Sequence, residues 1–189
     1  MGAADGRDKM LGRLVAHVRA HGLEPDASLR RFADELGTSH RMLAYYFGSR
    51  DGLLASVLAA MRAEERESLH ATAQAWDLHD AVLAMWSYYT DPEQLREHRV
   101  FFYVFSLALQ DPELFSEFLA SLDTWVDVTT ELAIAEGFAP VEASRTAQLI
   151  VSAVRGLLMD RLASAVPDRV DAAFQLLVDR LVPVPSQTA

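Results

Sequence analysis

A chain of 189 residues, 51% of them hydrophobic, is long enough to bury a sizeable core without covalent cross-links. The sequence has no cysteine, which excludes disulfides, thiolate metal sites and thiol nucleophiles and agrees with a reducing cytoplasm. The first ten residues lack an apolar signal core, and the longest uncharged apolar run, residues 100–109, is far shorter than the roughly 20 residues of a membrane span. We therefore expect a soluble, cytoplasmic protein with no membrane partner.

Charge is distributed unevenly along the chain. The net charge is −10, yet residues 1–50 carry +2 and the remainder carries −12. An acidic surface repels DNA, so only the basic N-terminal end is suited to approach a phosphate backbone. The charge pattern therefore favours one orientation of the protein on DNA more than it raises affinity.

The first predicted helix covers residues 8–21 and ends before Gly22. His17 and His21 share one face of this helix at the spacing of metal ligands, but the sequence offers no evident third ligand. A histidine near a helix C-terminus is also explained by the helix dipole. We expect neither a metal nor a cofactor.

Residues 28–54 predict two short helices joined by a turn at Gly37, with a further helix directly after them. Apolar residues repeat on one face of each short helix, and Ala33 is small where the two helices would cross. This is the layout of a helix-turn-helix DNA-binding motif. The alternative is an ordinary helical hairpin on the protein surface.

The outward face of the second short helix would lie in the major groove of DNA. Arg41 is the best candidate for base recognition, because an arginine there can bridge O6 and N7 of guanine. Three flanking residues suit phosphates: Ser28 at a helix start, Tyr46 with its hydroxyl group, and Arg50 at the start of the next helix.

Residues 10–58, and above all the run LGTSHRMLAYYFGSRDGLL, resemble the tetracycline-repressor (TetR) family of bacterial regulators. The resemblance implies three DNA-binding helices followed by five or six helices of an effector domain. Two residues depart from the family pattern: Ala44 replaces the usual tyrosine, and Met42 replaces a small hydroxyl residue. By this resemblance, base contacts fall on Arg30, His40, Arg41 and Met42, and phosphate contacts on Ser28, Tyr45, Tyr46 and Arg50.

Proline and glycine divide the rest of the chain into helices. A long helix starts after Ser49, and the two Asp-Pro-Glu runs at 91–93 and 111–113 each predict a new helix with aspartate as N-cap. Pro140 and Pro167 predict two more helix starts. We therefore expect an all-α protein of about nine helices with no strand. It would comprise a DNA-binding domain at 1–50, a ligand-binding and dimerisation domain at 51–182, and a frayed tail at 183–189.

Aromatic side chains concentrate between residues 76 and 125. Ligand cavities between bundle helices are mostly apolar, so this concentration predicts a cavity, although each ring taken singly is better explained as part of the core. The candidates for ligand binding are Met61, Met85, Trp86, Tyr89, Phe101, Phe102, Phe105 and Trp125. No ligand class follows from them.

The last two long helices carry apolar stripes that could form a four-helix interface between two copies of the chain. Gly156 within one of them costs roughly 1 kcal/mol relative to alanine, which indicates close packing. The alternative is packing within one chain. The candidate interface residues are Ala147, Val151, Val154, Leu158, Leu177 and Leu181.

These patterns predict a homodimeric transcriptional regulator, most simply a repressor, that binds a palindromic DNA operator and releases it when a small-molecule effector binds. The alternative is a helical ligand-binding or interaction module that has lost specific DNA binding. The sequence contains no phosphate loop, nucleophile elbow or dinucleotide fingerprint, so we expect no enzyme.

Overall fold

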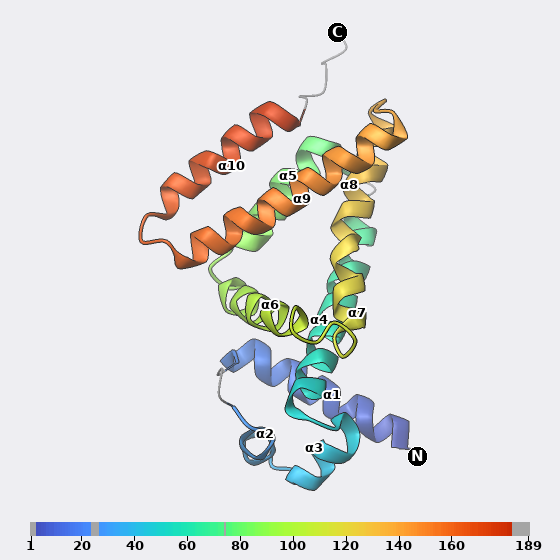
Figure 1. Cartoon of the computed structure of the whole chain (residues 1–189), viewed down its shortest axis with the longest axis vertical. Coiled ribbons are helices and arrows are strands. Elements are labelled where there is room, and N and C mark those ends of the chain that lie inside the picture. Colours follow the sequence, from blue (N-terminus) through green and yellow to red (C-terminus); the bar gives the residue numbers. More distant parts are fainter. Residues whose placement is uncertain (1–2, 24–26, 74, 183–189) are drawn as a thin grey trace. The chain divides into compact units, whose positions relative to one another are not determined.

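The computed structural model describes residues 3–23, 27–73 and 75–182, which form ten α-helices, one 3-10 turn and no strand (Figure 1). The expected all-α fold is confirmed, and the five-residue α7 brings the helix count above nine. The expected tail at 183–189 lies outside the described residues. The helices are α1 (Ala3–His21), α2 (Leu29–Glu35), α3 (His40–Phe47), α4 (Arg50–Ala73), α5 (Leu78–Thr90), α6 (Leu95–Ala108), α7 (Ser116–Ala120), α8 (Thr124–Ala135), α9 (Pro140–Ala163) and α10 (Pro167–Leu181), with the turn η1 (Ser121–Asp123) before α8.

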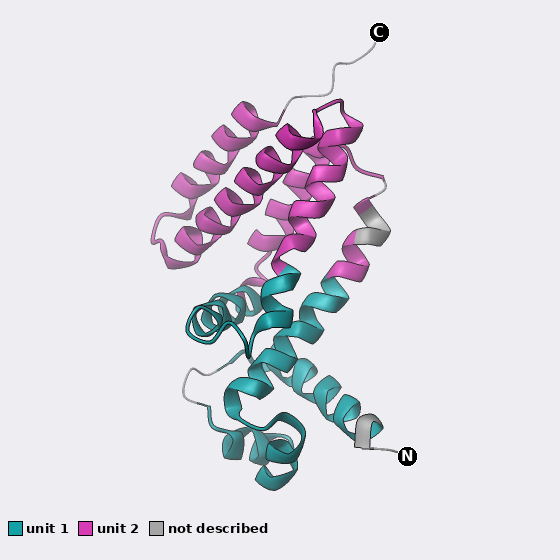
Figure 2. Cartoon of the chain, turned by 45° about the vertical axis from the view of Figure 1, so that its right-hand side comes forward, with its two compact units in different colours: residues 1–65, 96–121 teal, residues 66–95, 122–189 magenta. Residues whose placement is uncertain are grey.

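The chain packs as two compact units (Figure 2). Unit 1 comprises residues 1–65 and 96–121, and unit 2 comprises residues 66–95 and 122–189. Helices α6 and α7 thus belong to the same unit as the three N-terminal helices. The division at residue 50 remains a prediction about function, because the packing of the chain divides it elsewhere.

Two helices start later than the sequence predicts. Asp91 and Asp111 each cap a turn instead of a helix: the Asp91 carboxylate accepts the Glu93 backbone N–H at 2.8 Å, and that of Asp111 accepts the Leu114 N–H at 3.1 Å. Helix α6 therefore begins only at Leu95, and α7 at Ser116. An aspartate followed by proline favours both structures, and the sequence alone does not separate them.

The other helix boundaries follow local chemistry. Pro140 and Pro167 occupy the first turn of α9 and α10, where a missing N–H costs no hydrogen bond. Gly137, with φ of 96°, follows α8 in the backbone region that favours glycine. Among the described residues, no helix combines the length and the apolar character needed to cross a bilayer.

The core of unit 2 is built around α9, which packs against α5, α8 and α10. The rings of Trp86 on α5 and Phe174 on α10 stack with centroids 4.4 Å apart. The side chain of Glu136 accepts the backbone N–H of Leu78 at 2.6 Å, which ties the end of α8 to the start of α5.

The apolar stripe of α9 lies inside this core. Ala147, Val151, Val154 and Leu158 are at most 4% exposed within a single chain, so they offer little surface to a partner, and their place in a dimer interface remains a prediction. Leu177 and Leu181 on α10 are half-buried. The alternative of packing within one chain therefore holds for the four residues of α9. An amphipathic stripe shows that a face is buried but not what covers it.

Candidate nucleic-acid interface

Helices α2 and α3 form the expected helix-turn-helix. The Ser28 hydroxyl accepts the Arg31 backbone N–H and caps α2, and the Ser39 hydroxyl accepts the Met42 N–H and caps α3, both at 3.2 Å. Gly37, with φ of 60°, allows the chain to leave α2, and the Thr38 N–H then reaches back to a carbonyl of α2 at 2.8 Å. Gly37 and Ser39 thus define the turn between the two helices, and Ser28 defines the start of the first.

The exposed face of α3 carries the residues predicted to contact bases. His40 and Arg41 are exposed, as is Met42, while Leu43 and Phe47 are buried on the opposite face. Tyr45 is 71% exposed, an unusual position for an aromatic side chain unless it serves a binding surface. The helix therefore has one exposed face that can enter a groove of DNA and one buried face that belongs to the core.

The predicted residues outside this face differ in accessibility. Arg30 on α2 and Ser28 at its N-cap are exposed. Tyr46 is half-buried, and its hydroxyl lies so close to Gly6 of α1 that a Cβ at Gly6 would overlap it. Ala44, where the resemblance implies a tyrosine, is half-buried.

Arg50 is held inside unit 1 by contacts that the sequence did not indicate. Its Nε donates to the Ala27 carbonyl at 2.7 Å, one terminal nitrogen pairs with Asp51 at 3.0 Å, and the other donates to the Tyr103 hydroxyl at 2.7 Å. Its side chain is 24% exposed. This differs from the extended surface arginine expected of a phosphate contact, and the phosphate role of Arg50 remains a prediction.

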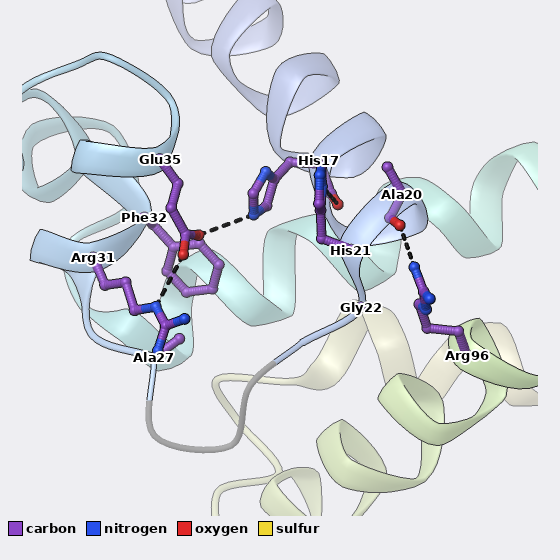
Figure 3. A pocket seen from close by; sticks show the side chains of 9 residues that line it. All are labelled: His17, Ala20, His21, Gly22, Ala27, Arg31, Phe32, Glu35 and Arg96. Carbon is purple, nitrogen blue, oxygen red and sulfur yellow. Dashed lines mark hydrogen bonds and ion pairs between the residues drawn. The ribbon is translucent and has the colours of Figure 1, made fainter.

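A hollow of about 570 Å³ lies beside the helix-turn-helix, between α1, α2 and the start of α6 (Figure 3). Within it, Glu35 on α2 accepts a hydrogen bond from Arg31 Nε at 2.9 Å and pairs with His17 Nε2 on α1 at 3.0 Å. The Arg31 hydrogen bond is the main reason that the pKa of Glu35 falls below its usual value. His17 and His21 stack with ring centroids 4.6 Å apart.

These contacts explain the two histidines without a metal ion. His17 is paired with a carboxylate, and His21 Nδ1 faces the His17 backbone carbonyl at 3.1 Å. The ion pair between His17 and Glu35 joins α1 to α2. Since α2 packs against α3, it also helps to hold the recognition helix in place. Sequence reasoning missed Glu35 because no local pattern joins it to His17.

The predicted ligand-binding residues divide between the two units. Met61, Met85, Trp86 and Trp125 are buried, whereas the other four are half-buried. Those in unit 1 are Met61, Phe101, Phe102 and Phe105, and those in unit 2 are Met85, Trp86, Tyr89 and Trp125. Their role in ligand binding remains a prediction.

Each unit brings some of these rings together. In unit 1, Phe101 lies 5.2 Å from Phe102 and 6.0 Å from Phe105 between ring centroids. In unit 2, the Tyr89 and Trp125 centroids are 6.3 Å apart.

A buried arginine beside the unit 1 rings was not predicted. Arg62 on α4 is 8% exposed, pairs with Glu65, and lies over the Phe101 ring at 5.6 Å. On α6, burial raises the pKa of Glu97, although Arg19 lies 3.8 Å from its carboxylate. Charged residues such as Arg62 and Glu97 do not recur at a regular spacing, so no sequence pattern indicates that they are buried or half-buried.

The described part of the chain is an N-terminal helix-turn-helix followed by a helical body. Comparison with solved structures identifies the fold as that of the TetR-family regulators. No protein-family model and no curated protein sequence matches the chain.

Three of these solved structures are similar over nearly the whole chain. A transcriptional regulator from Rhodococcus sp. RHA1 has a TM-score of 0.74 at 22% identity, covering 95% of this chain and 99% of the other. A transcriptional regulator from Saccharomonospora viridis, in complex with choline, has a TM-score of 0.68 at 19% identity, with coverages of 93% and 95%. A TetR-family regulator from Pectobacterium atrosepticum has a TM-score of 0.67 at 19% identity, with coverages of 97% and 99%. All three are transcriptional regulators.

Proposed function

We propose that this protein is a transcriptional regulator that binds double-stranded DNA through α3. The observation that carries the proposal is the exposed face of α3, where His40, Arg41 and Met42 stand outward on a helix whose opposite face is buried. Arg41 would contact guanine and Met42 a thymine methyl group in the major groove. The positive charge of residues 1–50 in an otherwise acidic chain supports the same orientation.

We infer that two copies of the chain bind a palindromic operator. A single short recognition helix makes few contacts, whereas a two-fold dimer places two such helices about 34–36 Å apart, in successive major grooves. Exposed apolar side chains on α9 and α10 support pairing: Leu149 is 53% exposed, Met159 53% and Leu176 57%. These three residues replace the buried α9 stripe as the proposed interface.

The proposed regulator acts as a repressor that releases DNA when a small molecule binds between the helices of its body. Ligand binding would shift helices that contact α4, and tilting α4 would move the two recognition helices off the spacing of one DNA turn. A quaternary ammonium compound is the first effector to test. The neighbour from S. viridis was solved with choline, and in this chain the neighbouring rings of Tyr89 and Trp125 are aromatic groups of the kind that bind such cations.

Fluorescence anisotropy with DNA flanking the protein's own gene tests the proposal. Specific binding should survive excess unrelated DNA, and Arg41→Ala should lower it. An Arg66→Ala variant, on an exposed position of α4, is the matched control. If the wild-type chain bound all sequences alike, the protein would instead be a module without specific DNA binding, which Ala44 favours because it leaves one contact of the family unmade.

A further inference from the structure

Arg50 joins three segments of unit 1 through one guanidinium group. It is the first residue of α4, its Nε donates to Ala27 immediately before the N-cap of α2, and a terminal nitrogen donates to Tyr103 on α6. The guanidinium also lies over the Tyr103 ring, 5.6 Å from its centroid. The Ala27 residue is 3% exposed, so this bridge reaches a buried part of the backbone.

The geometry of the bridge demands arginine. A guanidinium presents its donors in a rigid planar fork, so one group can serve Ala27 and Tyr103 at fixed directions. A lysine has a single ammonium on a flexible stem and cannot reproduce both contacts with the same geometry. Asp51, 3.0 Å from the other terminal nitrogen, offsets the positive charge that a phosphate would meet.

We propose that Arg50 is a positioning residue that fixes the start of α2 relative to α6, and that Tyr103 is the α6 end of this link. The predicted phosphate contact is thereby reassigned to an internal role. The inference rests on the proposed DNA binding, since α2 and α3 must be held in place to enter a groove. It also names the path by which a shift of α6 would reach the helix-turn-helix: Tyr103, Arg50 and the Ala27 carbonyl.

Two conservative variants separate positioning from phosphate contact. Arg50→Lys keeps the positive charge and loses the fork, and Tyr103→Phe keeps the ring and loses the hydroxyl. We expect each to weaken operator binding by about tenfold, as the loss of a charge-assisted hydrogen bond suggests. The double variant should be little weaker than either one, because both break the same bridge. Tyr88→Phe on α5 is the matched control.

Salt dependence provides the deciding measurement. Operator affinity measured between about 50 and 200 mM salt should keep its slope in Arg50→Lys, in Tyr103→Phe and in Arg50→Ala, because no phosphate contact is lost. A lost phosphate contact would instead flatten the slope by about 0.9. The proposal is overturned if Arg50→Ala flattens the slope in this way, or if Tyr103→Phe binds the operator like the wild type.

Amide hydrogen exchange tests the link without DNA. In Tyr103→Phe we expect faster exchange in α2 and α3 and no change in unit 2, with circular dichroism reporting intact helices. If the wild-type chain bound no operator but exchange accelerated as expected, the proposed function would fail while the positioning role stood. Unchanged exchange in α2 and α3 would contradict the positioning role whatever the DNA result.

Discussion

Replacing Leu149 and Leu176 by alanine should dissociate the proposed dimer. Both side chains are slightly more than half exposed in the single chain, at 53% and 57%. Full burial of a leucine contributes about 2 kcal/mol, so covering the exposed half of each contributes about 1 kcal/mol. A two-fold interface contains each residue twice, so the double substitution removes about 4 kcal/mol, which corresponds to an increase in the dimer Kd of about a thousandfold.

Sedimentation velocity over a range of protein concentrations measures this change. The double variant should sediment as a monomer at concentrations where the wild type is a dimer. Its circular dichroism spectrum should report intact helices. Leu109→Ala, at an exposed leucine (63%) in the turn that follows α6, is the matched control and should leave the dimer unchanged. A double variant that dimerised as tightly as the wild type would show that this surface is not the interface.

Four further predictions concern the recognition helix, two carboxylates and a buried ring. Arg41→Ala should relax specificity at one base position by about 1–3 kcal/mol, measured by competition with operators substituted one base at a time; equal losses on every sequence would contradict base contact. Burial raises the pKa of Glu97 above 4.5, so ionisation of Glu97 lowers the free energy of unfolding as pH rises from 4.5 through that raised value. Glu97→Gln should therefore raise the unfolding temperature at neutral pH, and the difference should vanish below pH 4.5. The opposite sign holds for Glu35, whose pKa is lowered mainly by Arg31: Glu35→Gln should lower the unfolding temperature at neutral pH, with the difference lost in acid. Phe174→Ala should cost about 3–5 kcal/mol of stability in chemical denaturation, because Phe174 is 3% exposed and stacks on Trp86.

Local chemistry made most of the fold predictable. Gly37 defines the turn of the helix-turn-helix, and Pro140 and Pro167 define the starts of α9 and α10, because each acts on its own backbone within a few residues. The Asp-Pro-Glu run at 91–93 was misjudged by a few residues because an aspartate side chain caps a turn as readily as a helix.

Contacts between distant residues could not be predicted. Glu35 meets His17 across 18 positions, and Arg50 meets Tyr103 across 53. No periodicity encodes such pairs. For the same reason the exposed face of α3 was predicted correctly, whereas the partner of the buried α9 stripe was not: the first depends on spacing along one helix, and the second depends on which helices pack together.

The discontinuous make-up of unit 1 restricts how this gene could exchange parts with others. A recombination junction after residue 50 would join the three N-terminal helices to the remaining helices of another protein. It would also sever the bond between Arg50 and Tyr103, and the bond from Arg96 on α6 to the Ala20 carbonyl at the end of α1. Working chimaeras that exchange unit 2 should therefore carry residues 96–121 together with residues 1–65, which requires three crossovers instead of one.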